Sequence, residues 1–275
     1  MPDWHHDDGL RWRPLAPFGA EIDHDLSQPM PAPTRDRFVA LFRDHGLIVA
    51  HGQSLTMDQQ RALLGLLGPI LTREGESGYL SNASGPASSS ELRYHADAAY
   101  TEDPFAALAL HAVDLVDGAS STRFVHAERA LETLPADLRT RLAAHPAEMI
   151  TPAMETLALR SCDVREHHPI HRELLPSIRR NPRTGRDYIA VSEMHGARLD
   201  GMDWEESRAL LGAVFDHLYA PASVHEHVWH MGDLVLWDNI ACQHARGSIA
   251  SAGRRILQRV IVGTTAVAAP HVRAA

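Results

Sequence analysis

The sequence predicts an α+β fold built around a closed or sandwiched β-sheet. Helical patterns gather early in the chain, strand-like alternation fills its last third, and no internal repeat or linker divides it. The chain has 275 residues, enough for one large domain with a sizeable core. We therefore expect an extended N-terminal segment over residues 1–33 and a single domain over residues 34–275.

Local signals predict the elements of the first quarter. The N-terminal segment mixes Pro, Asp and His without sustained periodicity, which is typical of a loosely ordered stretch. Thr34 can cap the helix that follows, and Gly46 can end it. The apolar run at residues 47–50 then predicts a buried strand. Thr56 is placed to start a second helix, which Gly68 would end.

The middle of the chain begins with a long connection. Residues 74–90 are rich in Gly, Ser and Asn, a composition typical of a lid or a substrate loop. A strand-like stretch that contains His95 and Asp97 follows it. Residues 126–145 carry helical signals that Pro135 interrupts, so two short helices are expected there.

The second half of the chain is richer in strands. A turn is predicted at residues 181–186. Asp203 and Glu206 have the spacing of a capping box, at the start of a helix that Pro221 follows. Strands are predicted at residues 188–191, 224–230, 233–237 and 255–263. We expect these strands to supply much of the central sheet.

Composition excludes several classes of partner. Lys and Arg number 26 against 35 Asp and Glu, a formal net charge of −9, which suits neither nucleic acid nor an anionic membrane. The two cysteines, Cys162 and Cys242, are too few for a disulfide framework or a cysteine-based zinc site. No apolar run approaches the roughly 20 residues of a membrane span, and the first residues lack the pattern of a signal peptide. We expect a cytoplasmic protein that acts on a small molecule.

Two histidines and one aspartate are candidate metal ligands. A His-x-Asp pair on a strand places both side chains on one face, about 7 Å apart along the backbone, and His95 and Asp97 have this spacing. His244 follows the strand and turn pattern of residues 232–239 and could complete the set. Two imidazoles and one carboxylate leave three positions open on a non-haem Fe(II). Open positions are needed where a cosubstrate and dioxygen both bind the metal.

A late strand carries two arginines on one face. The period of two over residues 255–262 places Arg255 and Arg259 on the same side. If that side points inward, each guanidinium is desolvated and requires an anion, because the cost is several kcal/mol. A dicarboxylate cosubstrate would supply one with geometry suited to arginine. Pairing with distant carboxylates, or a solvated face, would also explain the pattern.

Taken together, these residues resemble the Fe(II)/2-oxoglutarate dioxygenases of the taurine and 2,4-dichlorophenoxyacetate dioxygenase (TauD/TfdA) family. The motifs that carry the resemblance are His95-Ala96-Asp97, Thr122, Trp237-Asp238-Asn239, His244, Arg255 and Arg259. Three spacings agree: 27 residues from the first histidine to the threonine, and 11 and 15 residues from the second histidine to the two arginines. The resemblance extends from about Leu47 to Gly263 and implies a double-stranded β-helix, a cupin-like jelly roll, flanked by helices.

The resemblance also implies roles for single residues. His95, Asp97 and His244 would be the catalytic metal ligands that hold Fe(II). Arg255 and Thr122 would bind the C5 carboxylate of 2-oxoglutarate, and Arg259 would approach its C1 carboxylate and an acidic group of the substrate. With dioxygen, such an enzyme hydroxylates, or through hydroxylation cleaves, a small anionic organic substrate and releases succinate and CO2. Relatives associate as dimers or tetramers, so a homo-oligomer is implied.

Three further side chains are candidates for substrate binding. Arg73 could bind a substrate anion, although an exposed loop arginine is also expected at such a position. Tyr79 and Tyr94 could line the cavity, and packing alone would account for them equally well. Residues 118–121 read Gly-Ala-Ser-Ser where the family has Gly-Gly-Asp before its threonine, so the loop carrying Thr122 is expected to have its own shape.

Other functions fit parts of this pattern. Desaturation or cyclisation in a biosynthetic pathway would use the same ligands and cosubstrate. A zinc hydrolase could use the same two histidines and carboxylate, but it leaves Arg255 and Arg259 without a role. A non-catalytic jelly-roll protein could keep the metal for structure. Asp97 argues against the related halogenases, in which a small residue replaces the carboxylate.

Overall fold

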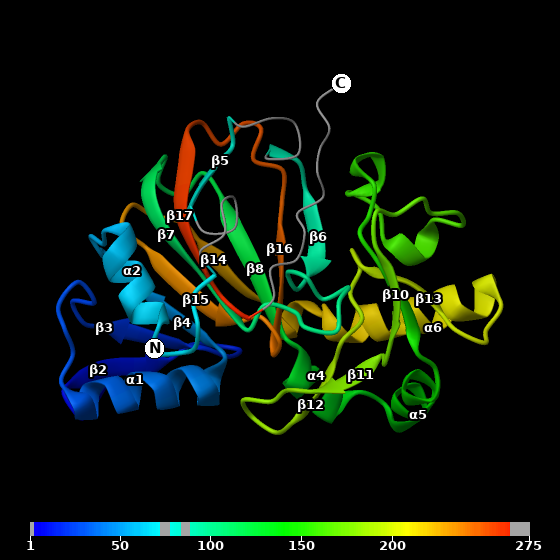
Figure 1. Cartoon of the computed structure of the whole chain (residues 1–275), viewed down its shortest axis with the longest axis horizontal. Helices are drawn as coiled ribbons and strands as arrows, with labels where there is room; N and C mark the ends of the chain where they lie inside the picture. Colours follow the sequence, from blue (N-terminus) through cyan, green and yellow to red (C-terminus); the bar gives the residue numbers. More distant parts are fainter. Residues whose placement is uncertain (1–2, 72–77, 84–88, 265–275) are drawn as a thin grey trace.

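Two β-sheets face each other at the centre of the molecule (Figure 1). The structure is a computed structural model that describes residues 3–71, 78–83 and 89–264. The larger sheet has the strand order β1-β2-β3-β4-β15-β7-β17-β5, and the smaller has the order β14-β8-β16-β6. Side chains from both sheets, among them Phe124, Trp237 and Leu257, fill the space between them and are at most 1% exposed. The predicted jelly-roll core is therefore confirmed.

The larger sheet is antiparallel except where β3 runs parallel to β4. Its strands are β1 (His5–Asp7), β2 (Leu10–Pro14), β3 (Ala20–Asp23), β4 (Leu47–Ala50), β5 (Gly78–Ser81), β7 (Ala107–Leu115), β15 (Leu234–Asp238) and β17 (Arg255–Val262). The N-terminal segment is more ordered than expected, because Leu10, Trp12 and Ile22 alternate inward and are buried. The sheet thus includes strands on both sides of the predicted boundary between residues 33 and 34.

The smaller sheet carries two of the predicted metal ligands. Its strands are β6 (Leu92–His95), β8 (Ser121–His126), β14 (His225–Val228) and β16 (Cys242–Arg246). All of its pairings are antiparallel. Because β16 lies between β8 and β6, residues more than a hundred positions apart in sequence become neighbours.

Two helices cover the outer face of the larger sheet: α1 (Ala32–His45) and α2 (Met57–Leu64). Helix α1 ends at Gly46 as predicted, but it begins before Thr34, since Pro33 in its first turn suits an earlier start. The Thr34 hydroxyl instead donates to the Asp8 carbonyl at 2.7 Å. Helix α2 starts at Thr56 and ends before Gly68, as predicted. Thr56 and Gln59 also form a complete capping box.

A second group of elements covers the smaller sheet from its outer side. It comprises α4 (Ala127–Thr133), α5 (Ala136–Ala144), α6 (Trp204–Leu218), β9 (Ala147–Ile150), β10 (Arg172–Leu175), β11 (Ile178–Arg180), β12 (Asp187–Ile189), β13 (Gly196–Leu199) and the 3-10 turns Met154–Thr156, Ser161–Asp163 and Pro221–Ser223. Asp203 caps α6 by accepting from the Glu206 amide, as predicted. Helix α6 lies with β10 and β13 on the right of Figure 1.

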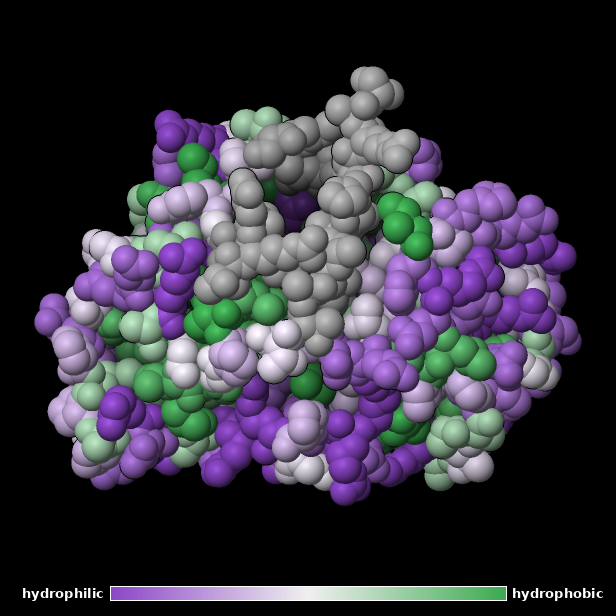
Figure 2. Space-filling model, viewed as in Figure 1, coloured by the Kyte–Doolittle hydropathy of each residue, from purple (hydrophilic) through white to green (hydrophobic). Residues whose placement is uncertain are grey.

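Hydrophilic and hydrophobic side chains are intermixed over the face shown in Figure 2, and that face is hollowed near its centre. None of the helices in the described part of the chain is long and apolar enough to cross a membrane.

Candidate active site

Three of the predicted ligands converge at the edge of the smaller sheet. His95, the last residue of β6, pairs with His244 on β16, and their ring centroids are 4.2 Å apart. Asp97 lies in the turn beyond β6, not on the strand as expected, and its Oδ1 is 3.3 Å from Nε2 of His95. One ligand atom from each residue lies within 4.8 Å of the other two. No other group of this kind occurs among residues 3–71, 78–83 and 89–264.

The protonation states of these side chains suit a divalent metal. Nδ1 of His95 is 2.8 Å from the Arg93 carbonyl, which can only accept, so Nδ1 carries a proton and Nε2 is the nitrogen that faces Asp97. Burial, followed by the charge of His95, lowers the pKa of His244 to about 3, so this ring is neutral near pH 7. Burial alone would raise the pKa of Asp97, but His95, His244 and the Arg259 guanidinium outweigh it and lower the pKa. Imidazole nitrogens and a carboxylate fit Fe(II) as well as zinc.

A cavity of about 320 Å³ adjoins His244, and Thr122, Arg255 and Arg259 line it. The predicted period-two alternation on β17 therefore brings both arginines to one cavity. Arg255 is 5% exposed and donates from Nε to the Ser120 hydroxyl at 3.2 Å. Burial lowers the pKa of Arg255 to about 10, with nearby Arg246 contributing.

The surroundings of the cavity favour an anionic ligand. In the part of the chain that the structure describes, Arg255 forms no ion pair with a carboxylate. The Thr122 hydroxyl accepts a hydrogen bond from Trp229 Nε1 at 3.0 Å, which leaves its own proton available to donate. A buried cation beside a free hydroxyl is stabilised by a bound carboxylate.

The candidate substrate residues have different outcomes. Tyr79, on β5, lines the same cavity and is 63% exposed. Tyr94 is not among the residues that line it. Tyr94 instead lies in the core and stacks on Tyr219, with ring centroids 4.0 Å apart. Arg73 lies outside the described residues.

Two further side chains near the site were not predicted. Arg246 lines the cavity and lies two residues after His244 on β16, so the period of two could have identified it. His195 is 4% exposed, and its ring centroid is 6.0 Å from that of His95. It reaches the site from the loop before β13, and no local spacing in the sequence indicates that contact.

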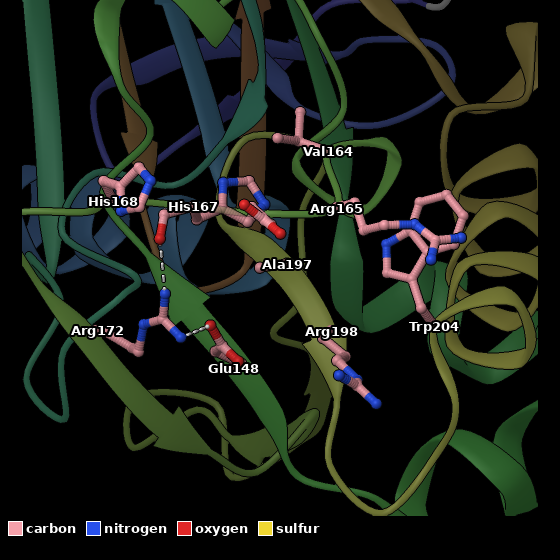
Figure 3. Close-up of a pocket in the computed structure, with 10 residues that line it drawn as sticks. Glu148, Val164, Arg165, His167, His168, Arg172, Ala197, Arg198 and Trp204 are labelled. Atoms are coloured by element: carbon pink, nitrogen blue, oxygen red, sulfur yellow. Dashed lines mark hydrogen bonds and ion pairs between the residues drawn. The ribbon is translucent and has the colours of Figure 1, made fainter.

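A second pocket, of about 310 Å³, lies between β9, β10 and the start of α6 (Figure 3). Several of its charged groups already have partners. Arg172 pairs with Glu148 at 2.6 Å and donates to the His167 carbonyl at 3.1 Å. Arg165 lies 4.4 Å from the centroid of the Trp204 ring. Since these groups already have partners, we favour the cavity beside His244 as the active site.

Comparisons with known proteins give matches to this chain in both sequence and structure. The sequence model of the family described as "Taurine catabolism dioxygenase TauD, TfdA family" matches residues 11–261. The chain is 26% identical to the alpha-ketoglutarate-dependent 2,4-dichlorophenoxyacetate dioxygenase of Cupriavidus pinatubonensis, across 90% of this chain and 94% of that one. A local match to pentalenolactone F synthase of Streptomyces arenae is 36% identical over 86 residues, 31% of this chain and only 29% of that relative. A taurine dioxygenase structure from Burkholderia xenovorans shares the fold with a TM-score of 0.77, at 22% identity, over 95% of this chain and 93% of that one.

Proposed function

The chain belongs to the TauD/TfdA family of 2-oxoglutarate-dependent dioxygenases, and on this basis we propose which reaction it catalyses and which residues take part. The proposed reaction uses Fe(II), 2-oxoglutarate and dioxygen to hydroxylate, or through hydroxylation to cleave, a small anionic organic substrate. Succinate and CO2 are the coproducts. The observation that carries this proposal is the buried guanidinium of Arg255, which lines the same cavity as His244. Among the described residues, no carboxylate forms an ion pair with it.

The proposed metal ligands are His95, Asp97 and His244. Bound Fe(II) would supply the activation of dioxygen. The chain's own contribution is to hold three ligands on one side, so that the other positions stay open for ligands. The Arg93 carbonyl fixes the tautomer of His95, which directs Nε2 toward the site.

The proposed cosubstrate subsite is formed by Arg255 and Thr122. Arg255 would bind the C5 carboxylate through a two-point contact, and the Thr122 hydroxyl would donate to the same group. Arg259 would neutralise the C1 carboxylate or an acidic group of the substrate. Apolar side chains of the cavity, Leu80, Leu92 and Leu110, would exclude water and strengthen these charge interactions.

The anionic substrate class follows from the balance of charges. Arg246, Arg255 and Arg259 line the cavity, whereas none of the lining residues that the structure describes is acidic. This basic lining favours anionic ligands. Desaturation or cyclisation would start from the same bound complex, so product analysis distinguishes these outcomes. Zinc hydrolysis and a non-catalytic role both leave Arg255 without a function.

A screen for succinate release tests the proposal. The wild-type protein with Fe(II) and 2-oxoglutarate is tested against carboxylates, sulfonates, sulfate esters and amino-acid derivatives. We expect at least one anionic compound to accelerate succinate formation, and Asp97→Ala to abolish that acceleration. Asp58→Ala, at a side chain that is 93% exposed, is the matched control and should keep full activity. Substrate-dependent turnover retained by Asp97→Ala would refute the ligand set.

A further inference from the structure

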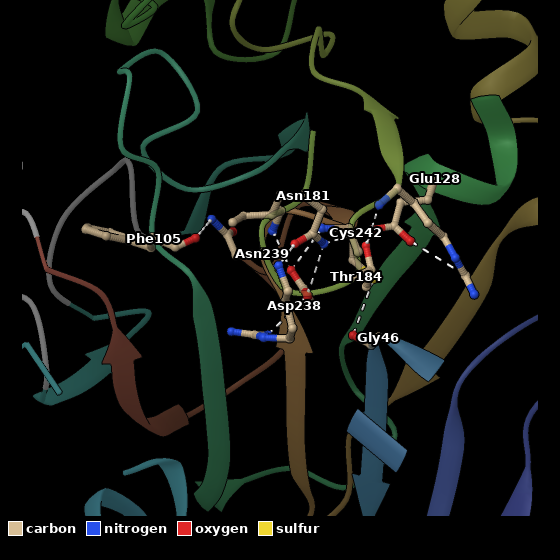
Figure 4. Close-up of polar contacts among 12 residues, drawn as sticks. Gly46, Phe105, Glu128, Asn181, Thr184, Asp238, Asn239 and Cys242 are labelled. Atoms are coloured by element: carbon tan, nitrogen blue, oxygen red, sulfur yellow. Dashed lines mark hydrogen bonds and ion pairs between the residues drawn. The ribbon is translucent and has the colours of Figure 1, made fainter. Parts of the chain in front are cut away.

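Asn239, at the turn after β15, holds the backbone of Asp97 on both sides. Its Oδ1 accepts from the Asp97 amide at 2.9 Å, and its Nδ2 donates to the Asp97 carbonyl, also at 2.9 Å. The same Nδ2 donates to the Phe105 carbonyl at 2.8 Å, a bond drawn in Figure 4. Asn239 is fully buried, so water cannot replace these bonds. One side chain thus ties the Asp97 turn to the start of β7.

The Asp97 turn depends on this contact. It follows the end of β6, and Ala98 adopts a left-handed backbone with φ of 61°. A residue with a Cβ is strained in that conformation and keeps it only where surrounding contacts impose it. The Asn239 amide supplies such contacts at Asp97, the residue immediately before Ala98.

The loop that carries Asn239 is itself firmly anchored. Asp238 is 1% exposed, and its Oδ1 accepts from the amides of Ile240 and Ala241. Its Oδ2 accepts from Asn181 at 3.3 Å and from Arg183 at 3.1 Å. Figure 4 shows Asn181, Asp238 and Asn239 close together at the centre of the view. The loop therefore provides a rigid base for Asn239.

The same loop leads directly into the strand that carries His244. Strand β16 begins at Cys242, and His244 is its third residue. Asp97 and His244 are 147 positions apart in sequence, yet the loop is joined to one by the chain and to the other by the Asn239 amide. The distance between these two ligands is consequently set at Asn239.

We propose that Asn239 is a positioning residue that holds Asp97 in register with His244 and so determines the affinity of the metal site. This inference rests on the proposed metal ligands. Asn239 does not touch the metal, and it acts through the backbone of Asp97. Partners that orient metal ligands in this way typically change metal affinity by about 10- to 100-fold when they are removed.

Titration with Mn(II), followed by its electron paramagnetic resonance signal, tests the proposal without requiring turnover. The variants are Asn239→Ala, Asn239→Ser, Asp97→Ala and Asn181→Ala. Asn181 is the matched control, because it is also a fully buried asparagine and contacts the same loop, but it makes no bond to Asp97. We expect both Asn239 variants to bind Mn(II) about 10- to 100-fold more weakly than the wild type. Asn181→Ala should lose thermal stability and change Mn(II) affinity much less than either Asn239 variant, because Asn181 makes no bond to Asp97.

The outcomes separate this inference from the proposed function. If Asn239→Ala does not fold, Asn239→Ser gives the answer, since its small polar side chain leaves fewer buried backbone groups without a hydrogen-bond partner. Mn(II) affinity in the Asn239 variants equal to that of Asn181→Ala would overturn the positioning role. If Asp97→Ala binds Mn(II) as tightly as the wild type, the proposed ligand set itself fails.

Discussion

Arg255 donates to a serine hydroxyl and lies 5.9 Å from the centroid of the Trp229 ring, with 5% of its surface exposed. A cation in that position is stabilised by an anionic ligand, and Thr122 in the same cavity offers a hydroxyl that can donate to a carboxylate. In the proposed function, this residue therefore selects a cosubstrate with a distal carboxylate.

Arg255→Gln should weaken binding of N-oxalylglycine, a stable analogue of 2-oxoglutarate, to the Mn(II)-loaded protein. We expect a loss of about 2–4 kcal/mol, or roughly 30- to 1000-fold, because one partner of a buried charge pair is removed. Calorimetric titration measures it. Arg254→Gln is the control, since that neighbouring side chain is 71% exposed and pairs with Asp114. A 2-oxo acid without a distal carboxylate should bind the wild type and Arg255→Gln with the same affinity. If Arg255→Gln weakens binding of that acid as much as binding of N-oxalylglycine, the assignment of Arg255 is wrong.

His126 makes stability depend on pH. It is 6% exposed, and burial, followed by the charges of Arg129 and Arg186, lowers its pKa to about 3. The unfolded histidine binds a proton below about pH 6.5, while the folded one stays neutral, so this contribution is complete above pH 6.5 and falls with pH. The loss is about 1.4 kcal/mol per pH unit, or roughly 2 kcal/mol at pH 5.

Urea unfolding at pH 7.5 and pH 5 measures this effect. His126→Gln should narrow the difference in unfolding free energy between the two pH values, whereas His168→Gln, at an exposed position, should not. Unchanged pH dependence in His126→Gln would show that the ring is not buried in its neutral form.

The sequence pattern identifies residues by the face of a strand, and this limits what it can predict. Alternation correctly placed Arg255 and Arg259 on one side of β17. The same rule placed Asp97 on a strand, but the left-handed Ala98 ends β6 before it. His195 contacts the site from a distant loop, so no period reveals it.

At the scale of elements, helix α2 supports the strand that carries the arginines. Gln60 of α2 donates to the carbonyls of Ala109 on β7 and Gln258 on β17, and it accepts from the Gln258 side chain at 2.7 Å. The helix is fixed at its start by Thr56, whose hydroxyl accepts from the Gln59 amide. Stability of α2 should therefore be linked to that of β17.

Thr56→Ala should lower the free energy of unfolding by about 1 kcal/mol, because it removes the N-cap of α2. Thr56→Ser keeps the hydroxyl and is expected to lie within about 0.5 kcal/mol of the wild type. Chemical denaturation of the wild type and the two variants measures these free energies of unfolding. Equal loss in both variants would mean that the methyl group, not the cap, matters.

Elements with strong local signals were predicted well, and those without them were not. The strand at Leu47–Ala50, the break at Pro135 and the cap at Asp203 all follow from neighbouring residues. The three N-terminal strands were missed, because they are short and are stabilised by pairing with one another and with β4. Local periodicity cannot report such partners.

At the scale of the whole molecule, the site exists only because the jelly roll brings distant strands together. His95 and His244 are register partners on β6 and β16, although 149 positions separate them. The resemblance to a known family predicted the jelly roll, whereas alternation alone left the sheet closed or sandwiched. The homo-oligomer stays a prediction, which analytical ultracentrifugation can test.

Anaerobic addition of 2-oxoglutarate to the Fe(II)-loaded protein tests whether the proposed site binds the metal and the cosubstrate together. When 2-oxoglutarate chelates Fe(II), a weak visible charge-transfer band appears, and we expect it in the wild type. Arg255→Gln should lack the band at a cosubstrate concentration that saturates the wild type, and Arg254→Gln should keep it. If the wild-type protein shows no band with excess Fe(II) and 2-oxoglutarate, the proposed Fe(II) and 2-oxoglutarate site is wrong.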